Sequence, residues 1–73
     1  MHTHTPTTAP KTGKTYTCIF KNEPLYDAVV EHASGCWANV KVVSVHPGKH
    51  EHQYKTGQTF EIKVQYYEFV ERV

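Results

Sequence analysis

The sequence has little that would support a membrane-spanning or secreted protein. None of its 73 residues belong to a run approaching the ~18 consecutive apolar residues that a transmembrane helix needs. Its first residues also lack the charged and then apolar pattern of a signal sequence. We therefore expect a cytoplasmic protein with no membrane partner. One domain is the most that this length supports, because domains usually need about 50 to 200 residues.

The chain also lacks a marked excess of charge of either sign. Eight basic residues face seven acidic ones, which gives a formal net charge of +1 at pH 7. Modules that bind nucleic acid mainly through its phosphates usually carry a clear basic excess. The single arginine, Arg72, also disfavours bidentate recognition of guanine or phosphate. Composition therefore gives nucleic-acid binding no support, without excluding it.

The motifs of common enzyme classes are missing as well. The four glycines stand singly, so the chain has no glycine-rich phosphate loop, and it contains no serine nucleophile elbow or HExxH motif. The two cysteines, Cys18 and Cys36, fall in different predicted elements. Without a signal sequence we expect both to be reduced and buried thiols. The sequence thus predicts a non-enzymatic protein that needs no cofactor.

Residues 1–13, MHTHTPTTAPKTG, differ in composition from the rest of the chain. They hold five threonines and two prolines, and few bulky apolar side chains. Such a segment cannot bury enough apolar area to offset the entropy lost on ordering it. We expect residues 1–13 to be a disordered Thr/Pro/His tail and residues 14–73 to form a single small barrel-like domain.

Alternation of side chains predicts the first strand over residues 14–21. Tyr16, Cys18 and Phe20 share one face of it, and β-branched residues dominate the other. This spacing predicts a strand whose aromatic face points into the core.

Residues 24–34, PLYDAVVEHAS, are compatible with two structures. Asn22 can cap the start of a helix, and Gly35 stands where a helix typically ends. The alternative is a strand in which Tyr26 and Ala28 share a face, with a turn after it. The capping pattern favours the first structure, so we expect a short helix over about 24–34.

Two further strands are predicted downstream. Trp37 to His46 is apolar on both faces and ends before the turn sequence Pro47-Gly48. Thr59 to Val73 is longer than a usual strand, so we expect a bend or bulge near Tyr66-Tyr67 that shifts the alternation downstream. Together these elements predict a mostly β (α+β) fold, a small bent sheet or partly closed β-barrel with one short helix.

Surface recognition is the function that remains. Outward-facing side chains of the last two strands form the predicted partner-binding set: Trp37, Lys41, Lys63, Gln65, Tyr67 and Phe69. Exposed aromatic side chains on a strand favour binding of another protein or of a second copy, giving a homodimer. The same rings and lysines are also typical of platforms that bind single-stranded nucleic acid, which is the alternative.

Histidine is in excess, with six residues in the chain. His50 and His52 are two residues apart, and His46 precedes His50 by four. Zinc, nickel or copper accepts imidazole nitrogens in such sets, although this spacing matches no structural zinc pattern. A metal site at these three histidines is therefore a second alternative, and solvated loop histidines are the simpler interpretation.

Overall fold

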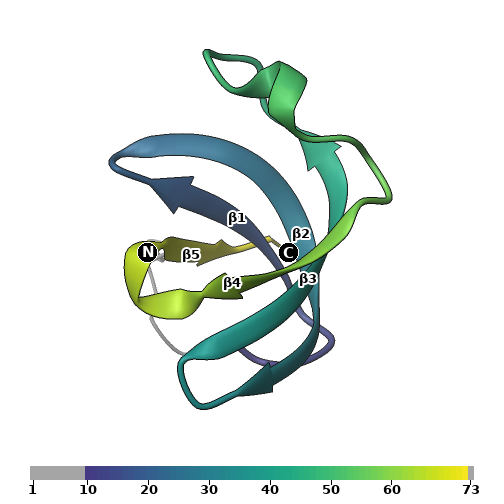
Figure 1. Ribbon diagram of the computed structural model, residues 1–73, viewed down its shortest axis with the longest axis vertical. Coiled ribbons are helices and arrows are strands. Elements are labelled where there is room, and N and C mark those ends of the chain that lie inside the picture. Colours follow the sequence, from purple (N-terminus) through teal and green to yellow (C-terminus); the bar gives the residue numbers. More distant parts are fainter. Residues whose placement is uncertain (1–9, 73) are drawn as a thin grey trace, which may run out of the picture.

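The structure, a computed structural model, describes residues 10–72 (Figure 1). Its elements in chain order are β1 (Thr15–Phe20), β2 (Glu23–Ser34), β3 (Trp37–Val45), the 3-10 helix η1 (Glu51–Gln53), β4 (Thr59–Lys63), the 3-10 helix η2 (Val64–Tyr66) and β5 (Glu68–Glu71). These segments form strands because apolar and polar side chains alternate along them, so that one face can be buried.

The start of the described chain lies against the sheet. Pro10 is buried, and the Gly13 N–H donates a hydrogen bond to the Val30 carbonyl at 2.7 Å. Residues 10–13 of the predicted tail are thus among the described residues and contact the sheet. The rest of the predicted tail, residues 1–9, lies outside the described residues.

The five strands form one antiparallel sheet in the order β4-β3-β2-β1-β5. Three successive hairpin connections join β1 to β4, and β5 returns to pair with β1 on its other side. The sheet coils around its own inner face, but β4 and β5 do not pair, so the barrel is not closed (Figure 1). The prediction of a mostly β fold is confirmed.

The predicted helix over 24–34 is wrong, because these residues form most of β2. The cause lies in the turn before it, where Lys21 and Asn22 have φ of 51° and 65°. Positive φ at both central residues is the mark of the type I′ turn that joins strands in two-residue hairpins. Asn22 thus reverses the chain between paired residues Phe20 and Glu23 and caps no helix.

The second apparent helix signal, Gly35, also belongs to a hairpin. Its φ is 59°, and it opens the two-residue connection between the paired residues Ser34 and Trp37. A positive φ at this first central position favours glycine in tight hairpin turns. Both residues that suggested helix ends are therefore turn residues.

Irregularities in pairing bend β2 strongly. Its register shifts once against β1, between Cys18 and Ile19, and twice against β3. Each shift adds an unpaired residue, which increases local twist and curvature. The long strand therefore curves around the core (Figure 1), and Pro24 is tolerated because it lies beside the first shift.

The inner face of the coiled sheet holds the core. Its buried apolar residues are Tyr16, Cys18, Leu25, Tyr26, Ala28, Val30, Ala38, Val40, Val42, Ile62, Val64 and Phe69. The expected bend near Tyr66-Tyr67 is confirmed by η2, which interrupts the last predicted strand. The described helical segments have only three residues each, and none is long and apolar enough to span a membrane.

Candidate binding surface

Two large exposed aromatic side chains flank one lysine where β3 begins and β4 ends. Trp37 is 43% exposed and Tyr66 is 57% exposed. Lys63 is the cross-strand partner of Trp37, and its Nζ lies 5.6 Å from the Trp37 ring centroid and 5.8 Å from that of Tyr66. Both distances are within the range of cation–π attraction. We call Trp37, Lys63, Gln65 and Tyr66 the tryptophan surface.

Backbone pairing places these side chains together. The Val64 N–H donates to the Cys36 carbonyl at 2.8 Å, which fixes the start of η2 against the β2–β3 turn. The 3-10 turn then breaks the strand alternation, so that Val64 is buried while Gln65 and Tyr66 are exposed. Tyr66 therefore reaches the same side as Trp37.

Four residues of the predicted partner-binding set are at least partly accessible to solvent. Trp37, Lys41 and Gln65 are exposed and Lys63 is half-buried. Sequence reasoning did not include Tyr66 in this set, although the predicted bend at this position was a signal that the alternation changes there.

Two residues of the predicted set face elsewhere. Phe69 is 0% exposed, so the expectation that it lies on the outer face is wrong. Tyr67 is half-buried, with its ring 5.4 Å from that of Phe20 and 6.1 Å from that of Phe69. The physical reason is η2, which turns Phe69 from the outer face to the inner one.

Charges beside the tryptophan surface are mixed in sign. On the exposed face of β3 and β4, Lys41 pairs with Thr59, Asn39 pairs with Glu61, and Lys63 follows next to Trp37. The Glu61 carboxylate therefore lies between two lysines along these strands. Such a face does not present a continuous positive stripe.

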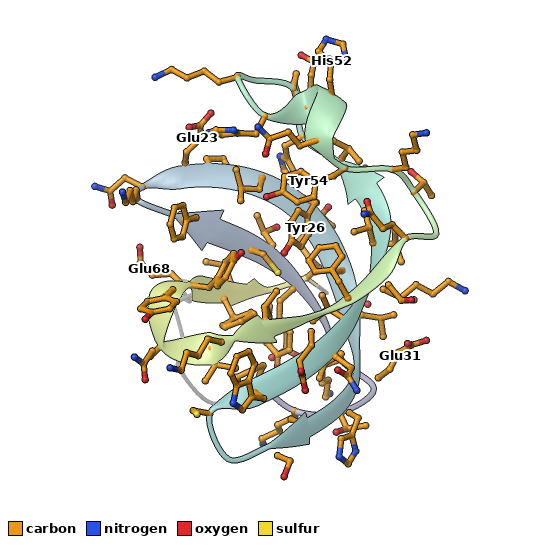
Figure 2. All side chains as sticks on the ribbon, viewed as in Figure 1. Glu23, Tyr26, Glu31, His52, Tyr54 and Glu68 are labelled. Carbon is orange, nitrogen blue, oxygen red and sulfur yellow. The ribbon has the colours of Figure 1, made fainter. Side chains whose placement is uncertain are left out.

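A second aromatic group surrounds Tyr26 in the core. Its ring centroid lies 4.8 Å from that of Tyr54 and 5.6 Å from that of Phe60, and Figure 2 shows Tyr26 and Tyr54 next to one another. The Tyr26 hydroxyl is buried and has no hydrogen-bond partner among the described residues. Burial raises the pKa of Tyr26 above its ordinary value of 10.0, so the phenol stays neutral.

Cys18 lies in the same core and is chemically quiet. Burial, followed by the nearby negative charge of Asp27, raises the pKa of its thiol to about 12. A thiol with so high a pKa forms little of the reactive thiolate at neutral pH. Cys36 is free and exposed, so the expectation of a buried thiol is wrong for this residue, because it lies in the β2–β3 turn.

A polar cluster centred on Asp27 occupies the outer face of the sheet. The Thr17 hydroxyl donates to Asp27 Oδ1 at 2.6 Å, and His46 Nε2 donates to the same oxygen at 2.8 Å. Arg72 Nε lies 3.8 Å from Oδ2. Burial alone raises the pKa of Asp27, but the hydrogen bonds from Thr17 and His46 and the charges of His46 and Arg72 outweigh it. The pKa therefore lies below the ordinary 3.8.

The three histidines proposed as metal ligands are not brought together. His46 is bonded to Asp27, His50 Nε2 lies 3.9 Å from Glu23 Oε1, and His52 is exposed in η1 (Figure 2). Residues 10–72 contain no group of three or more His, Cys, Asp or Glu side chains that could hold a metal. The predicted metal site is therefore not assembled, because His46 points to the outer face of the sheet while the other two follow in the next loop.

Comparison with known proteins identifies no relative. No family model, curated protein or solved structure matches the chain. The observations that bear on function are therefore those of its own side chains, above all the tryptophan surface.

Proposed function

We propose that this protein is a small non-enzymatic binding module whose tryptophan surface binds another protein. The exposure of Trp37 and Tyr66 on either side of Lys63 is the observation that supports it. Tryptophan and tyrosine are enriched among the residues that contribute most to the affinity of protein interfaces. Their large rings bury apolar area while the indole N–H and phenol O–H keep a polar contact.

The surface is also prepared for binding before a partner arrives. Trp37 stands on a paired strand, and Tyr66 is held by η2 against the β2–β3 turn. The Lys63 ammonium between the two rings further restricts their positions. Less conformational entropy is lost on binding when the contact side chains are already ordered.

The cysteines support a reducing compartment as part of the same proposal. Cys18 and Cys36 are both free, and Cys36 is exposed. Exposed thiols persist where the cellular redox poise keeps them reduced, as in the cytoplasm. We therefore place the protein and its partner there.

The test compares the tryptophan surface with an exposed apolar residue elsewhere on β3. Partners crosslinked to the wild-type chain in cells are identified, and their affinities are measured for Trp37→Ala, Tyr66→Ala and the control Val43→Ala. Val43 is 45% exposed, close to the value for Trp37. Loss of a central interface aromatic typically costs 2 kcal/mol or more, so we expect a weakening of about thirtyfold for Trp37→Ala and little change for the control. Equal affinities for wild type and Trp37→Ala would contradict the proposal.

Single-stranded nucleic acid is a second candidate ligand for the same surface. A lysine between two exposed rings is the arrangement by which bases stack while an ammonium meets a phosphate. Glu61 between Lys41 and Lys63 weighs against it, because a carboxylate repels the backbone there.

The single tryptophan provides a direct test of this alternative. Titration with oligothymidylate at low salt should quench Trp37 fluorescence, and added salt should reverse the quenching. Unchanged fluorescence would exclude stacking of bases on Trp37.

A further inference from the structure

One edge of the sheet, β4, is free to pair with another strand. It is the end strand of the sheet and is bonded only to β3 among the described elements. Unpaired N–H and C=O groups on such an edge readily accept an added strand.

The pairing with β3 defines which backbone groups are free. The Val42 N–H donates to the Gln58 carbonyl at 2.8 Å, and the Val64 N–H donates to the Cys36 carbonyl at 2.8 Å. The register between these two bonds is regular, and bonded residues alternate with unbonded ones in antiparallel pairs. Phe60 and Ile62 therefore bond to β3, whereas the N–H and C=O groups of Thr59, Glu61 and Lys63 point away from the sheet.

Opposite charges on alternate residues make this edge complementary to itself in one antiparallel register. With Ile62 opposite Ile62 of a second copy, Glu61 of each chain faces Lys63 of the other, and these are the residues with free backbone groups. If the two-fold centre of the pairing moves by one residue, from Ile62 to Glu61 or to Lys63, then Glu61 lies opposite Glu61 or Lys63 lies opposite Lys63. Opposite charges across strands stabilise pairing and like charges destabilise it, so one register is selected.

We propose that the β4 edge pairs with β4 of a second copy of this chain, antiparallel and centred on Ile62, giving a two-fold symmetric dimer. The same patch meets itself across the axis, which closes the assembly at two copies. This dimer deepens the proposed function, because it names a second copy of the chain as one partner. It rests on the proposed function in one respect: Trp37, which lies beside Lys63, should become partly covered in the dimer.

The dimer should be weak and dependent on concentration. The edge spans the five residues of β4, and contacts well below ~1,200 Å² of total buried area belong to transient complexes. We therefore expect association in roughly the micromolar range or weaker, seen as a rise in weight-average mass with concentration in sedimentation velocity.

Charge reversal tests the register directly. Glu61→Lys alone places two lysines opposite each other at both contacts, and Lys63→Glu alone places two glutamates there. Each variant alone should dimerise at least tenfold more weakly than wild type. Mixed in equal amounts, the two variants restore both opposite-charge contacts and should form a heterodimer, and the double variant should dimerise with itself.

Lys41→Glu is the matched control, since Lys41 is an exposed lysine on β3 away from the edge. It should dimerise as wild type does. Recovery on mixing cannot arise from misfolded chains, because each component is the same variant that failed alone. Any one of three results would overturn the dimer. The wild type could stay monomeric at every concentration, a single variant could dimerise as well as the wild type, or the mixture could stay monomeric. Loss of affinity for a different protein in Trp37→Ala would still support the proposed function in those cases.

Discussion

The inner and outer faces of the same strands are specified by different physical interactions. The inner face is filled by apolar side chains, among which Tyr26 and Phe69 are fully buried. The outer face combines the Asp27 hydrogen-bond cluster with rings and charges in contact with water. The residues of the inner face are therefore constrained by side-chain volume, and those of the outer face by hydrogen-bond geometry and charge. Exposed positions of the outer face are not needed to fill the core.

The largest expected effect is on the inner face. Phe69→Ala removes a fully buried ring that contacts Tyr16 edge-on at 5.8 Å between centroids. Truncations of this kind cost about 3 to 5 kcal/mol, a large part of the stability of so small a domain. Urea unfolding should show this loss in the free energy of unfolding. Val43→Ala on the outer face is the control and should change stability by less than about 0.5 kcal/mol. If both variants lost a similar amount of unfolding free energy, the two faces would not differ in their contribution to stability.

The next effect is on the outer face. Asp27→Asn keeps the size of the side chain but removes its charge, and with it the full strength of the hydrogen bonds from Thr17 and His46. Weakening such a partly buried cluster should cost about 1 to 3 kcal/mol in the free energy of unfolding. Lys49→Gln, an exposed change in the loop after β3, is the charge-change control. A loss no larger than that of the control would show that the cluster is not stabilising.

The dependence of stability on pH should show the contribution of the Asp27 carboxylate separately. The pKa of Asp27 is lower in the folded chain than its ordinary 3.8, so the ionised form stabilises the fold. This contribution is complete above pH 3.8 and is lost as the pH falls through the lower, folded pKa. Wild type should therefore lose more stability than Asp27→Asn on acidification below about pH 4. Parallel acid profiles for the two proteins would be the contrary result.

A smaller effect on the free energy of unfolding should distinguish Tyr16 from Tyr26, two tyrosines that both face inward. The Tyr16 hydroxyl accepts a hydrogen bond from the Lys11 N–H at 2.9 Å, whereas the Tyr26 hydroxyl has no partner among the described residues. Tyr16→Phe should lower the free energy of unfolding by about 1 kcal/mol, and Tyr26→Phe should leave it unchanged or raise it by a similar amount. Thermal unfolding of the two variants in parallel measures the difference. A loss in Tyr26→Phe as large as that in Tyr16→Phe would indicate a bound partner for the Tyr26 hydroxyl.

The smallest effect concerns the tryptophan surface. Lys63→Met removes the ammonium between Trp37 and Tyr66 and keeps much of the aliphatic stem. Exposed cation–π contacts contribute about 0.5 to 1 kcal/mol, so stability should fall by no more than that while Trp37 fluorescence changes. Lys21→Met, which removes a lysine 5.4 Å from the Phe20 ring, should leave Trp37 fluorescence unchanged. No change in either measurement for Lys63→Met would mean that the ammonium does not order the rings.

Alternation predicted the strands because burial of one face follows directly from a two-residue period. It identified β1 and β3, and it placed Tyr16 and Cys18 on the face that is buried. It failed over β2 because Asn22 and Gly35 satisfy helix ends and hairpin turns equally well, and only pairing with β1 and β3 decides between them. Local preference was overridden by tertiary contacts there.

The tryptophan surface was predicted in part for a related reason. Trp37 and Lys63 follow from alternation within single strands, so they were found. Tyr66 and Phe69 depend on where the chain turns at η2, and an error of one residue exchanges the two faces. The Asp27 cluster joins residues distant in sequence, such as Thr17 and His46, and no local pattern shows their proximity.

The pairing of β1 with β5 places the first and last strands of the described fold side by side, with the Arg72 N–H bonded to the Thr15 carbonyl at 2.8 Å. Neighbouring strands are separated by only about 4.8 Å, so the start of β1 and the end of β5 lie next to each other in the sheet. The fold could therefore be placed as a cassette within an exposed loop of an unrelated host without forcing that loop apart. Equally, a short bridge between the ends would permit new termini in the loop around η1, with every strand kept in its place.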